Sequence, residues 1–281
     1  MISIITAVYN QLSMNKIYWE NLVHSTDGEF ELIIIDNNST DGSREYFESL
    51  DGRVKVIHND CNYSYPHSQN QGVEIARGDI LAFFNNDMIL SPHWDSRIQE
   101  VLGHNGNEIL SLGSNDRCCD KEVSRQLQRR WKRFKYPIIT LFGQSRFALK
   151  LMVRLCYGNW DRYCQRHFER YGLTTTQGFS GSAIIVTRRA MELIEIWDPR
   201  QQGADFNLFY QTCDYAERVG EELRPISIVN GIFANHYRRL TFYQKFPPFT
   251  DIDNIGGYND NWSNEQLARY NRVIDEFEPL A

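Results

Sequence analysis

The sequence contains no long apolar run. Its longest apolar stretches, such as LIII at 32–35 and ILAFF at 80–84, are four or five residues long, whereas a membrane-spanning helix needs about 20 residues. A helix that crosses a bilayer is therefore not expected. The amino terminus shows no basic region and no apolar signal core before ISIITAV at 2–8, so we expect a cytoplasmic protein rather than an exported one.

Phosphate-binding and cysteine motifs are also absent. No GxxxxGKS, GxxxxGKT or GxGxxG segment follows the first apolar run, which argues against a P-loop kinase and against a dinucleotide-binding dehydrogenase. The six cysteines show no CxxC spacing, and their density is far below that of a disulfide-stapled mini-domain. Free thiols in a reducing compartment are the expected state.

What the sequence does contain is a repeated pattern over its first 112 residues. A short run rich in Ile, Val and Phe is followed by a polar turn and a helix-like stretch. This alternation predicts an α/β fold, with a mostly parallel central sheet and helices on both faces. The predicted strands are 2–8, 30–36, 54–58, 79–84 and 108–113, and the predicted helices lie near 13–25, 42–50, 66–77 and 92–103.

Polar side chains gather where the predicted strands end. The first strand leads into Thr6, Tyr9 and Asn10, the second into DNNSTD at 36–41, and the fourth into NND at 85–87. Each loop alone is also explained as a turn with a helix cap. Three such loops together favour a ligand site, because parallel sheets bind ligands at the carboxyl ends of their strands. Acids without a glycine-rich loop indicate phosphate held through Mg²⁺ or Mn²⁺.

Three segments in residues 2–90 resemble glycosyltransferase family 2, the inverting enzymes of the GT-A fold, in order and in spacing. The segments are ISIITAVYNQ, LIIIDNNSTDGS and NYSYPHSQNQGVEIARGDILAFFNND. Their Asn-Asn pairs are most similar to the subgroup with bacterial rhamnosyltransferases of surface polysaccharide assembly. The resemblance implies metal-dependent transfer of a sugar from a UDP- or dTDP-sugar to a hydroxyl of a glycan or lipid-linked saccharide.

The resemblance also assigns residues to the nucleotide-sugar donor and the metal. Asp36 would accept a charge-assisted hydrogen bond from the imide N–H of the base. Asp87 would coordinate the metal, and His236 lies where several relatives place a metal-binding histidine, a ligand that suits Mn²⁺ better than Mg²⁺. The donor-binding residues implied are Thr6, Tyr9, Asp36, Asn38, Asn70 and Asn86.

The segment FNLFYQTCDYAERVGE departs from the family where a general base is expected. The usual Glu-Asp pair is replaced by Gln211 and Thr212, and neither side chain takes a proton from a hydroxyl at neutral pH. Three explanations stay open: Asp214 or Asp205 serves as the base, the acceptor supplies its own anion, or the chain is a catalytically weakened nucleotide-sugar binding domain. Asp214 is equally explained as a helix anchor that pairs with Arg218.

A basic segment interrupts the pattern. Residues 121–170 carry 13 Lys and Arg against three acidic residues, mixed with apolar side chains, and we expect helices broken around Pro137 and Gly143. One interpretation is a helical lid that packs on its own domain. The other is a peripheral contact with an anionic membrane at its inner face. Nucleic acid is not an expected partner, because the rest of the chain is acidic.

The whole chain, 1–281, is expected to form a single GT-A catalytic domain, and 42% hydrophobic residues are enough for its core. A nucleotidyltransferase would also use acids and Mg²⁺, but no glycine-rich basic loop follows the first strand. The expected parts are a nucleotide-sugar binding half at 1–112, a basic helical insertion at 116–172, an acceptor half at 178–240 and a C-terminal extension at 241–281 with a helix capped near Ser263.

Overall fold

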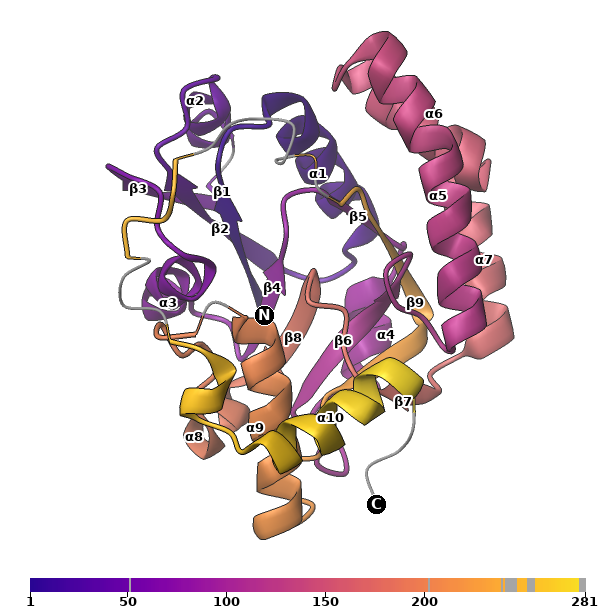
Figure 1. Cartoon of the computed structure of the whole chain (residues 1–281). Helices are drawn as coiled ribbons and strands as arrows, with labels where there is room; N and C mark the ends of the chain where they lie inside the picture. The colour runs from indigo at the N-terminus through magenta and orange to yellow at the C-terminus, as the bar shows by residue number, and fades with distance from the viewer. Residues whose placement is uncertain (51, 202, 239, 241–246, 252–255, 278–281) are drawn as a thin grey trace.

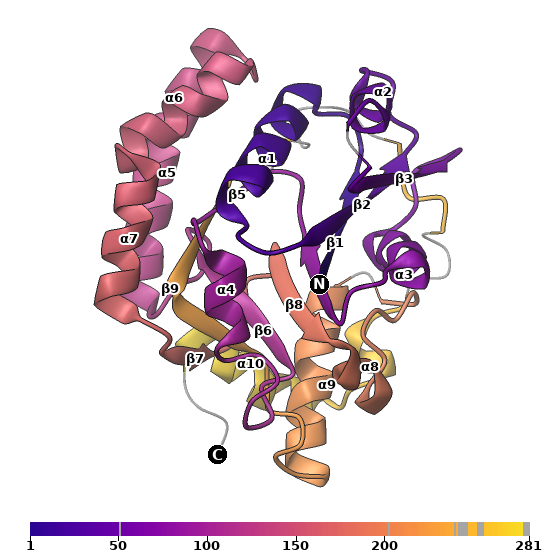
Figure 2. The ribbon, with the colours of Figure 1, turned by 180° about the vertical axis from the view of Figure 1, so that it is seen from behind.

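One mixed β-sheet runs through the centre of the protein, and helices cover both of its faces (Figures 1 and 2). The computed structural model describes every residue except 51, 202, 239, 241–246, 252–255 and 278–281. The strands follow the order β3-β2-β1-β4-β8-β6-β9-β5, and β7 pairs with β9 beside this path. The α/β architecture predicted from the sequence is confirmed.

Five strands agree with the sequence prediction to within one residue at each end. β1 pairs in parallel with β2 and with β4, and β2 pairs in parallel with β3. This half of the sheet is therefore parallel, as predicted. The bounds of the five strands are Ile2–Val8 for β1, Phe30–Asn37 for β2, Val54–Asn59 for β3, Ile80–Phe84 for β4 and Ile109–Ser114 for β6.

The other half of the sheet is mixed. β8 (Ala183–Thr187) runs antiparallel between β4 and β6, and β9 (Ser227–His236) runs parallel to β6. The short strands β5 (Met88–Leu90) and β7 (Thr175–Gln177) pair antiparallel with β9. As a result, the carboxyl ends of β1, β2, β3, β4, β6 and β9 share one edge with the amino end of β8. We call this the carboxyl edge.

The helices form two layers, one on each face of the sheet. In β1, Ile4 and Val8 face the layer of α1, α2 and α4, whereas Ile5 faces the layer of α3, α8, α9 and α10, because successive side chains of a strand point to opposite faces. The bounds of these helices are Leu12–Ser25 for α1, Ser43–Glu48 for α2, Trp94–Gln99 for α4, Tyr65–Ile75 for α3, Arg188–Leu193 for α8, Ala204–Arg218 for α9 and Asn264–Glu276 for α10.

Gly72 sets the position of α3 on the sheet. A Cβ at this residue would lie 2.3 Å from Cγ2 of Ile5 and 3.1 Å from Cδ1 of Ile35. Any larger side chain would therefore push α3 away from β1 and β2. The close approach fixes the distance between α3, which begins at Tyr65 near the carboxyl edge, and the sheet.

The basic insertion forms three helices along the β9 side of the molecule (Figure 1). They are α5 (Lys121–Phe142), α6 (Arg146–Tyr157) and α7 (Trp160–Tyr171). Their inner faces form one core with the end of β9, to which Trp131, Met152 and Phe233 contribute. The lid interpretation is therefore correct for the inner face of the insertion.

The predicted break at Pro137 is wrong, because α5 continues through this residue and ends at Phe142. A proline removes one hydrogen bond of a helix and crowds the preceding turn. On either side of it, Trp131 and Ile138 are buried against the domain, and this packing holds the helix together. The break expected at Gly143 is confirmed, since this glycine has a φ of 60°.

The C-terminal part contains the predicted helix. Ser263 caps α10, and its hydroxyl accepts the N–H of Gln266 in a capping box. The segment before it also returns to the donor half, where Asp251 accepts hydrogen bonds from the N–H and hydroxyl of Ser64 at 2.9 and 2.5 Å. All six cysteines are free thiols, as expected. None of the helices within the described ranges combines the length and apolar character that a bilayer crossing requires.

His167 on α7 makes the stability of the insertion dependent on pH. Its side chain is buried, its Nε2 lies 2.8 Å from the carbonyl of Asn230, and burial lowers its pKa to about 4. The unfolded chain, with a pKa near 6.5, binds the proton more readily, so the free energy of unfolding falls as the pH drops from 6.5 to 4.

The variant His167→Gln keeps a donor to Asn230 but cannot be protonated. We therefore expect its free energy of unfolding to depend less on pH between 6.5 and 4. Between pH 6.5 and 4 the wild type should lose up to about 3 kcal/mol more than the variant. Urea unfolding at half-unit pH steps measures both curves. Parallel curves would show that His167 is not the group responsible.

Candidate functional site

The loops after β1 and β2 are fastened to each other at the carboxyl edge. The N–H of Asn10 donates to Oγ of Ser39 at 2.7 Å, and Oδ1 of Asn10 accepts the N–H of Thr40 at 2.8 Å. Asn10, Gln11 and Asn38 have positive φ angles of 58°, 75° and 65°, and asparagine tolerates this conformation better than most residues. The asparagines in these loops therefore shape the backbone as well as offering amides.

Asp36 is fully buried at the end of β2. Its carboxylate accepts the N–H of Ser39 at 3.2 and 3.3 Å, and its Oδ2 lies 3.1 Å from Nδ1 of His58. His58 belongs to β3 and is paired with Asp36 in the strand register. A carboxylate held in this way is a fixed acceptor at the carboxyl edge.

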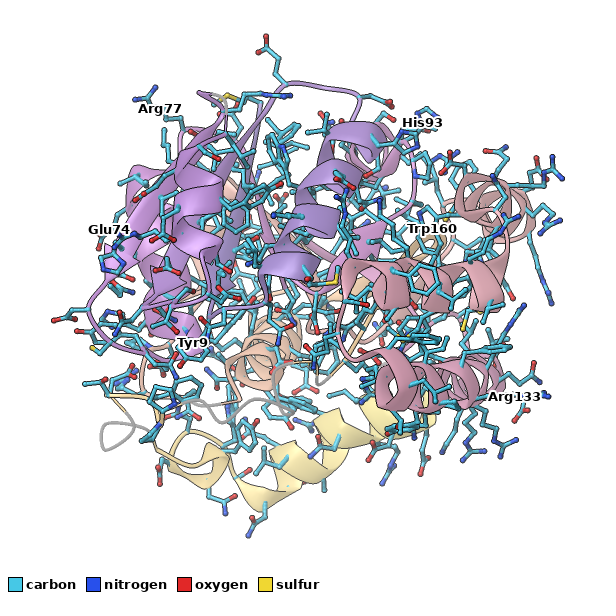
Figure 3. The ribbon with its side chains drawn as sticks, turned by 90° about the horizontal axis from the view of Figure 1, so that it is seen from above. Tyr9, Glu74, Arg77, His93, Arg133 and Trp160 are labelled. Atoms are coloured by element: carbon cyan, nitrogen blue, oxygen red, sulfur yellow. The ribbon has the colours of Figure 1, made fainter. Side chains whose placement is uncertain are left out.

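Thr6 and Tyr9, the other two residues assigned to the nucleobase, differ in position. Thr6 is buried within β1, and its Oγ1 lies 2.8 Å from the hydroxyl of Tyr18 on α1. Burial raises the pKa of Tyr18, so this phenol stays neutral and the pair is part of the core. Tyr9 lies beyond the end of β1, and Figure 3 shows it on the side of the parallel half of the sheet, away from the insertion.

The asparagines assigned to the donor pocket tie neighbouring segments together. Asn86 donates to Oδ1 of Asn15 on α1 at 2.7 Å, which links the loop after β4 to the first helix. Asn70 on α3 donates to the carbonyl of Trp197 at 2.9 Å. Asn38 is exposed and donates to the carbonyl of Asp60 at 2.9 Å. Each amide therefore has a protein partner that fixes its orientation.

Asp87 and His236 meet at the carboxyl edge. Asp87 comes directly before β5, and His236 ends β9, which pairs with β5. Nε2 of His236 lies 2.9 Å from Oδ1 of Asp87, and its Nδ1 lies 2.5 Å from Oδ2 of Asp116. Arg238 contacts the same Asp116 at 2.7 Å. Two carboxylates therefore hold one imidazole between them, although Asp87 and His236 are 149 residues apart in the sequence.

The two carboxylates determine the protonation of His236. Burial alone would lower its pKa, but the negative charges of Asp87 and Asp116, together with their hydrogen bonds, raise it to about 10. His236 is therefore protonated at neutral pH in this arrangement. The N–H and carbonyl of its backbone also pair with the amide of Asn115 at 2.7 and 2.9 Å, so the ring has a fixed orientation.

The donor atoms of Asp87 and His236 fit a divalent cation. A carboxylate oxygen and an imidazole nitrogen suit Mn²⁺, and a second carboxylate on the far ring nitrogen is the usual orienting partner of such a histidine. A cation at this pair would displace the proton between Oδ1 and Nε2. In the part of the chain that the structure describes, no three His, Cys, Asp or Glu side chains form a metal shell, so a bound diphosphate would have to supply further oxygens.

Asp205 lies at the same edge. It is near the start of α9, and a Cβ on Gly181 would meet its Oδ2 at 2.0 Å. The neighbouring Ser182 accepts the N–H of Asn85 through its carbonyl at 3.0 Å. This places Asp205 beside the loop that carries Asp87. Burial raises the pKa of Asp205.

The structure does not bring Asp214 or Thr212 to the carboxyl edge. Asp214 lies nine residues beyond Asp205, about 13 Å further along α9, and pairs with Arg218 at 2.6 Å. Thr212 is buried, and its hydroxyl accepts the N–H of Ile226 at 3.2 Å, just before the start of β9. A ten-residue strand separates that point from His236, a distance of about 30 Å.

Several buried polar atoms on α3, on Trp197 and in the loop after β1 have no hydrogen-bond partner among the described residues. They are Nε1 of Trp197, the hydroxyl of Tyr65, both amide atoms of Gln69 on the next turn of α3, and Nε2 of Gln11 in the loop after β1. Buried polar groups of native proteins are nearly always satisfied. These atoms are therefore available to the hydroxyl and carbonyl groups of a ligand.

The sequence reasoning missed Asp116, His58 and Asn15. Asp116 follows β6 by two residues, so the rule that ligands bind after strand ends would have found it. His58 lies opposite Asp36 in neighbouring strands, which becomes evident only once the register is known. Asn15 lies within α1 and carries no sequence signal for its contact with Asn86.

Comparison with known proteins identifies the family of the chain. Residues 3–167 match the family model described as "Glycosyl transferase family 2". EpsH of Bacillus subtilis (strain 168), a candidate glycosyltransferase, is 31% identical over 112 residues, which cover 39% of this chain and 32% of EpsH. TuaG of the same strain, a candidate teichuronic acid biosynthesis glycosyltransferase, is 33% identical over 94 residues, covering 31% of this chain and 36% of TuaG. The match thus spans about a third of each relative.

Two solved structures share the fold. GalNAc-T7 with UDP, GalNAc and Mn²⁺ superposes with a TM-score of 0.55 at 14% identity, covering 98% of this chain and 48% of that one. Residues 1–349 of TarS from S. aureus superpose with a TM-score of 0.52 at 12% identity, covering 86% of this chain and 62% of that one. The family match covers more than half of the sequence and the fold is GT-A, so the chain belongs to glycosyl transferase family 2.

Proposed function

We propose that the chain is a metal-dependent, inverting glycosyltransferase. It would move a sugar from a UDP- or dTDP-sugar to a hydroxyl of a glycan or lipid-linked saccharide. The observation that carries this proposal is that Asp36, the Asp87–His236 pair and Asp205 all lie at the carboxyl edge of the sheet. Such a transfer requires a hydrogen-bond acceptor for the nucleobase, ligands for a metal ion and a general base for the acceptor hydroxyl. Asp36, the Asp87–His236 pair and Asp205 would supply these three parts.

In the proposed reaction, Asp36 binds the nucleotide. Its carboxylate would accept the imide N–H of uracil or thymine, while Ser39 and His58 hold it in place. A hydrogen bond to an ionised acceptor is roughly twice as strong as a neutral one. The same contact would disfavour cytosine, which has no imide N–H in its neutral form. Asp36 thus supports a preference for UDP- or dTDP-sugars.

Asp87 and His236 would hold the divalent cation. When bound, Mn²⁺ or Mg²⁺ would neutralise the negative charge that develops on the leaving diphosphate. Asp116 keeps the ring of His236 turned toward Asp87 through its contact with Nδ1. The residues of this chain would therefore contribute a prearranged pair of ligands, and oxygens of the diphosphate would supply the others.

Asp205 is the proposed general base. It would take the proton of the acceptor hydroxyl while the new C–O bond forms at the anomeric carbon and the bond to the diphosphate breaks on the opposite face. A raised pKa makes a carboxylate a stronger base, and burial raises the pKa of Asp205. This assignment needs no carboxylate at positions 211 and 212.

The setting of the reaction is also part of the proposal. TuaG, with its link to teichuronic acid biosynthesis, and the Asn-Asn pairs of the two donor loops support a role in surface polysaccharide assembly, with a rhamnosyltransferase-like enzyme as the specific prediction. The acceptor would bind between the insertion and residues 178–240. A lipid-linked acceptor would place the reaction at a membrane surface.

We expect Asp87→Asn to remove metal-dependent donor binding without unfolding the protein. At a UDP concentration 100 times the dissociation constant, binding stabilises the wild type by about 2.7 kcal/mol, and this gain should depend on Mn²⁺ and disappear in the variant. Differential scanning fluorimetry measures it. Asp161→Asn is the matched control, because it removes another Asp–His pair, with His24, on α7. A variant that kept the full Mn²⁺-dependent shift would refute the metal assignment.

Asp36→Asn should weaken UDP binding about tenfold, since a neutral acceptor replaces an ionised one. Isothermal titration calorimetry gives the dissociation constants. Asp41→Asn is the control in the same loop, where Asp41 accepts the N–H groups of Leu12 and Ser43 at 2.8 and 3.1 Å. Equal weakening in both variants would mean that loop structure, rather than recognition of the base, had been lost.

Asp205→Asn should reduce transfer, or hydrolysis of the donor, at least about 100-fold while UDP still binds. Asp214→Asn, on the same helix, should keep the rate within a few-fold. In the wild type the rate should fall on the acid side as Asp205 becomes protonated. The reverse ranking of the two variants would assign the base to Asp214. A wild type that binds UDP-sugars but turns over none of them would favour the catalytically weakened domain.

A further inference from the structure

Exposed apolar side chains gather on one part of the insertion. Among the described residues, the other large exposed hydrophobic side chains lie singly on different elements, which is normal for a protein surface. On α5 and α6, by contrast, Leu141 is 74% exposed and Phe147 is 63% exposed. The full group on these two helices is Tyr136, Leu141, Phe142, Phe147 and Leu155.

Three of these residues form the point where α5 turns into α6. Leu141 and Phe142 end α5, Gly143 makes the turn, and Phe147 lies in the first turn of α6. The rings of Phe142 and Phe147 contact each other edge to face, with centroids 5.7 Å apart. We call Leu141, Phe142 and Phe147 the apolar tip. Figures 1 and 2 show this end of the insertion at the outside of the molecule.

Packing within the domain does not account for the tip. The inner face of α6 is already buried, with Leu149, Met152 and Cys156 in the core beside β9. Phe147, Leu151 and Leu155 follow at intervals of four residues and form a second apolar row on the same helix. Leu151 is only partly buried, and the other two are exposed. A lid that covers only its own domain needs the buried row of Leu149, Met152 and Cys156. It does not need the second row of Phe147, Leu151 and Leu155.

Exposed cations lie on α5 about 12 to 18 Å before the apolar tip along the helix axis. Arg129, Lys132 and Arg133 are exposed on α5, and no salt bridge within the described ranges joins them to a carboxylate. Figure 3 shows Arg133 at the outer edge of the molecule. On α6, Arg146 and Lys150 both pair with Glu20 of α1. The α5 side of the hairpin therefore keeps uncompensated positive charge.

We propose that the α5–α6 hairpin docks on an anionic phospholipid bilayer, with the apolar tip inserted at the boundary between headgroups and acyl chains. The exposed cations of α5 would contact lipid phosphates, and their long side chains can reach the headgroup level while the tip lies deeper. Charge and apolar contact are both required, because either signal alone gives weak and reversible attachment. Membrane docking would bring the site to a lipid-linked acceptor, and this part of the inference rests on the proposed function. The docking itself does not.

Sedimentation with lipid vesicles tests the proposal. The wild type should bind vesicles of phosphatidylcholine that contain 30 mol % phosphatidylglycerol, because this anionic lipid attracts basic residues. Its binding to vesicles of pure phosphatidylcholine should be at least about tenfold weaker. The triple variant L141S/F142S/F147S should lose at least about tenfold in partitioning to the anionic vesicles. The double variant K132Q/R133Q should bind more weakly and with a reduced dependence on salt.

The matched control is V23S/V219S, which removes two exposed apolar side chains elsewhere on the surface and should bind vesicles as the wild type does. Thermal unfolding of each variant checks that the fold is retained. UDP binding without vesicles should be the same in the wild type and the triple variant, so failure of the docking proposal and failure of the donor site give different results.

Two outcomes would overturn the proposal. A wild type that stays in the supernatant with anionic vesicles at low salt would exclude the bilayer as the partner. A wild-type dimer in light scattering, lost in the triple variant while vesicle binding is unaffected, would assign the apolar tip to a second copy of the chain.

Discussion

The ion cluster of Asp87, His236 and Asp116 is the interaction on which the carboxyl edge depends. The ring of His236 lies between the carboxylates of Asp87 and Asp116, and their negative charges raise the pKa of the imidazole to about 10, so the ring carries a proton at neutral pH. The three residues come from the loop before β5, the end of β9 and the loop after β6. One cluster therefore fixes the relative positions of segments that are far apart in the sequence, and it does so with groups that can exchange a proton for a cation.

Neutral amides hold the surrounding loops. Asn10, Asn15 and Asn86 connect the first loop, the first helix and the loop after β4 through hydrogen bonds of 2.7 to 2.9 Å. Amides can join backbone segments without adding charge. The negative charge at the carboxyl edge therefore comes from carboxylates such as Asp36, Asp87 and Asp205. The Asn-rich loops thus fix the backbone beside Asp36 and Asp87 without adding charge.

The sequence predicted the parallel half of the sheet well, because buried strands leave apolar runs of the right length and the polar turns mark their ends. The rest depends on contacts that no local pattern contains. α5 passes Pro137 because Trp131 and Ile138 are buried by a distant strand. His58 faces Asp36 only through the register of β2 and β3, which the sequence does not show. The family pattern pointed to positions 211 and 212, yet α9 carries those residues away from the edge and leaves Asp205 there.

Lys135 joins α5 to the segment that follows β9. Its Nζ donates to the carbonyl of Tyr237 at 2.8 Å and also to that of Arg238, and Tyr237 follows His236 directly. Trp131, one turn earlier, packs against the ring of Tyr237 with centroids 5.1 Å apart. The helix that ends at the apolar tip is therefore joined directly to the backbone segment that follows the site histidine.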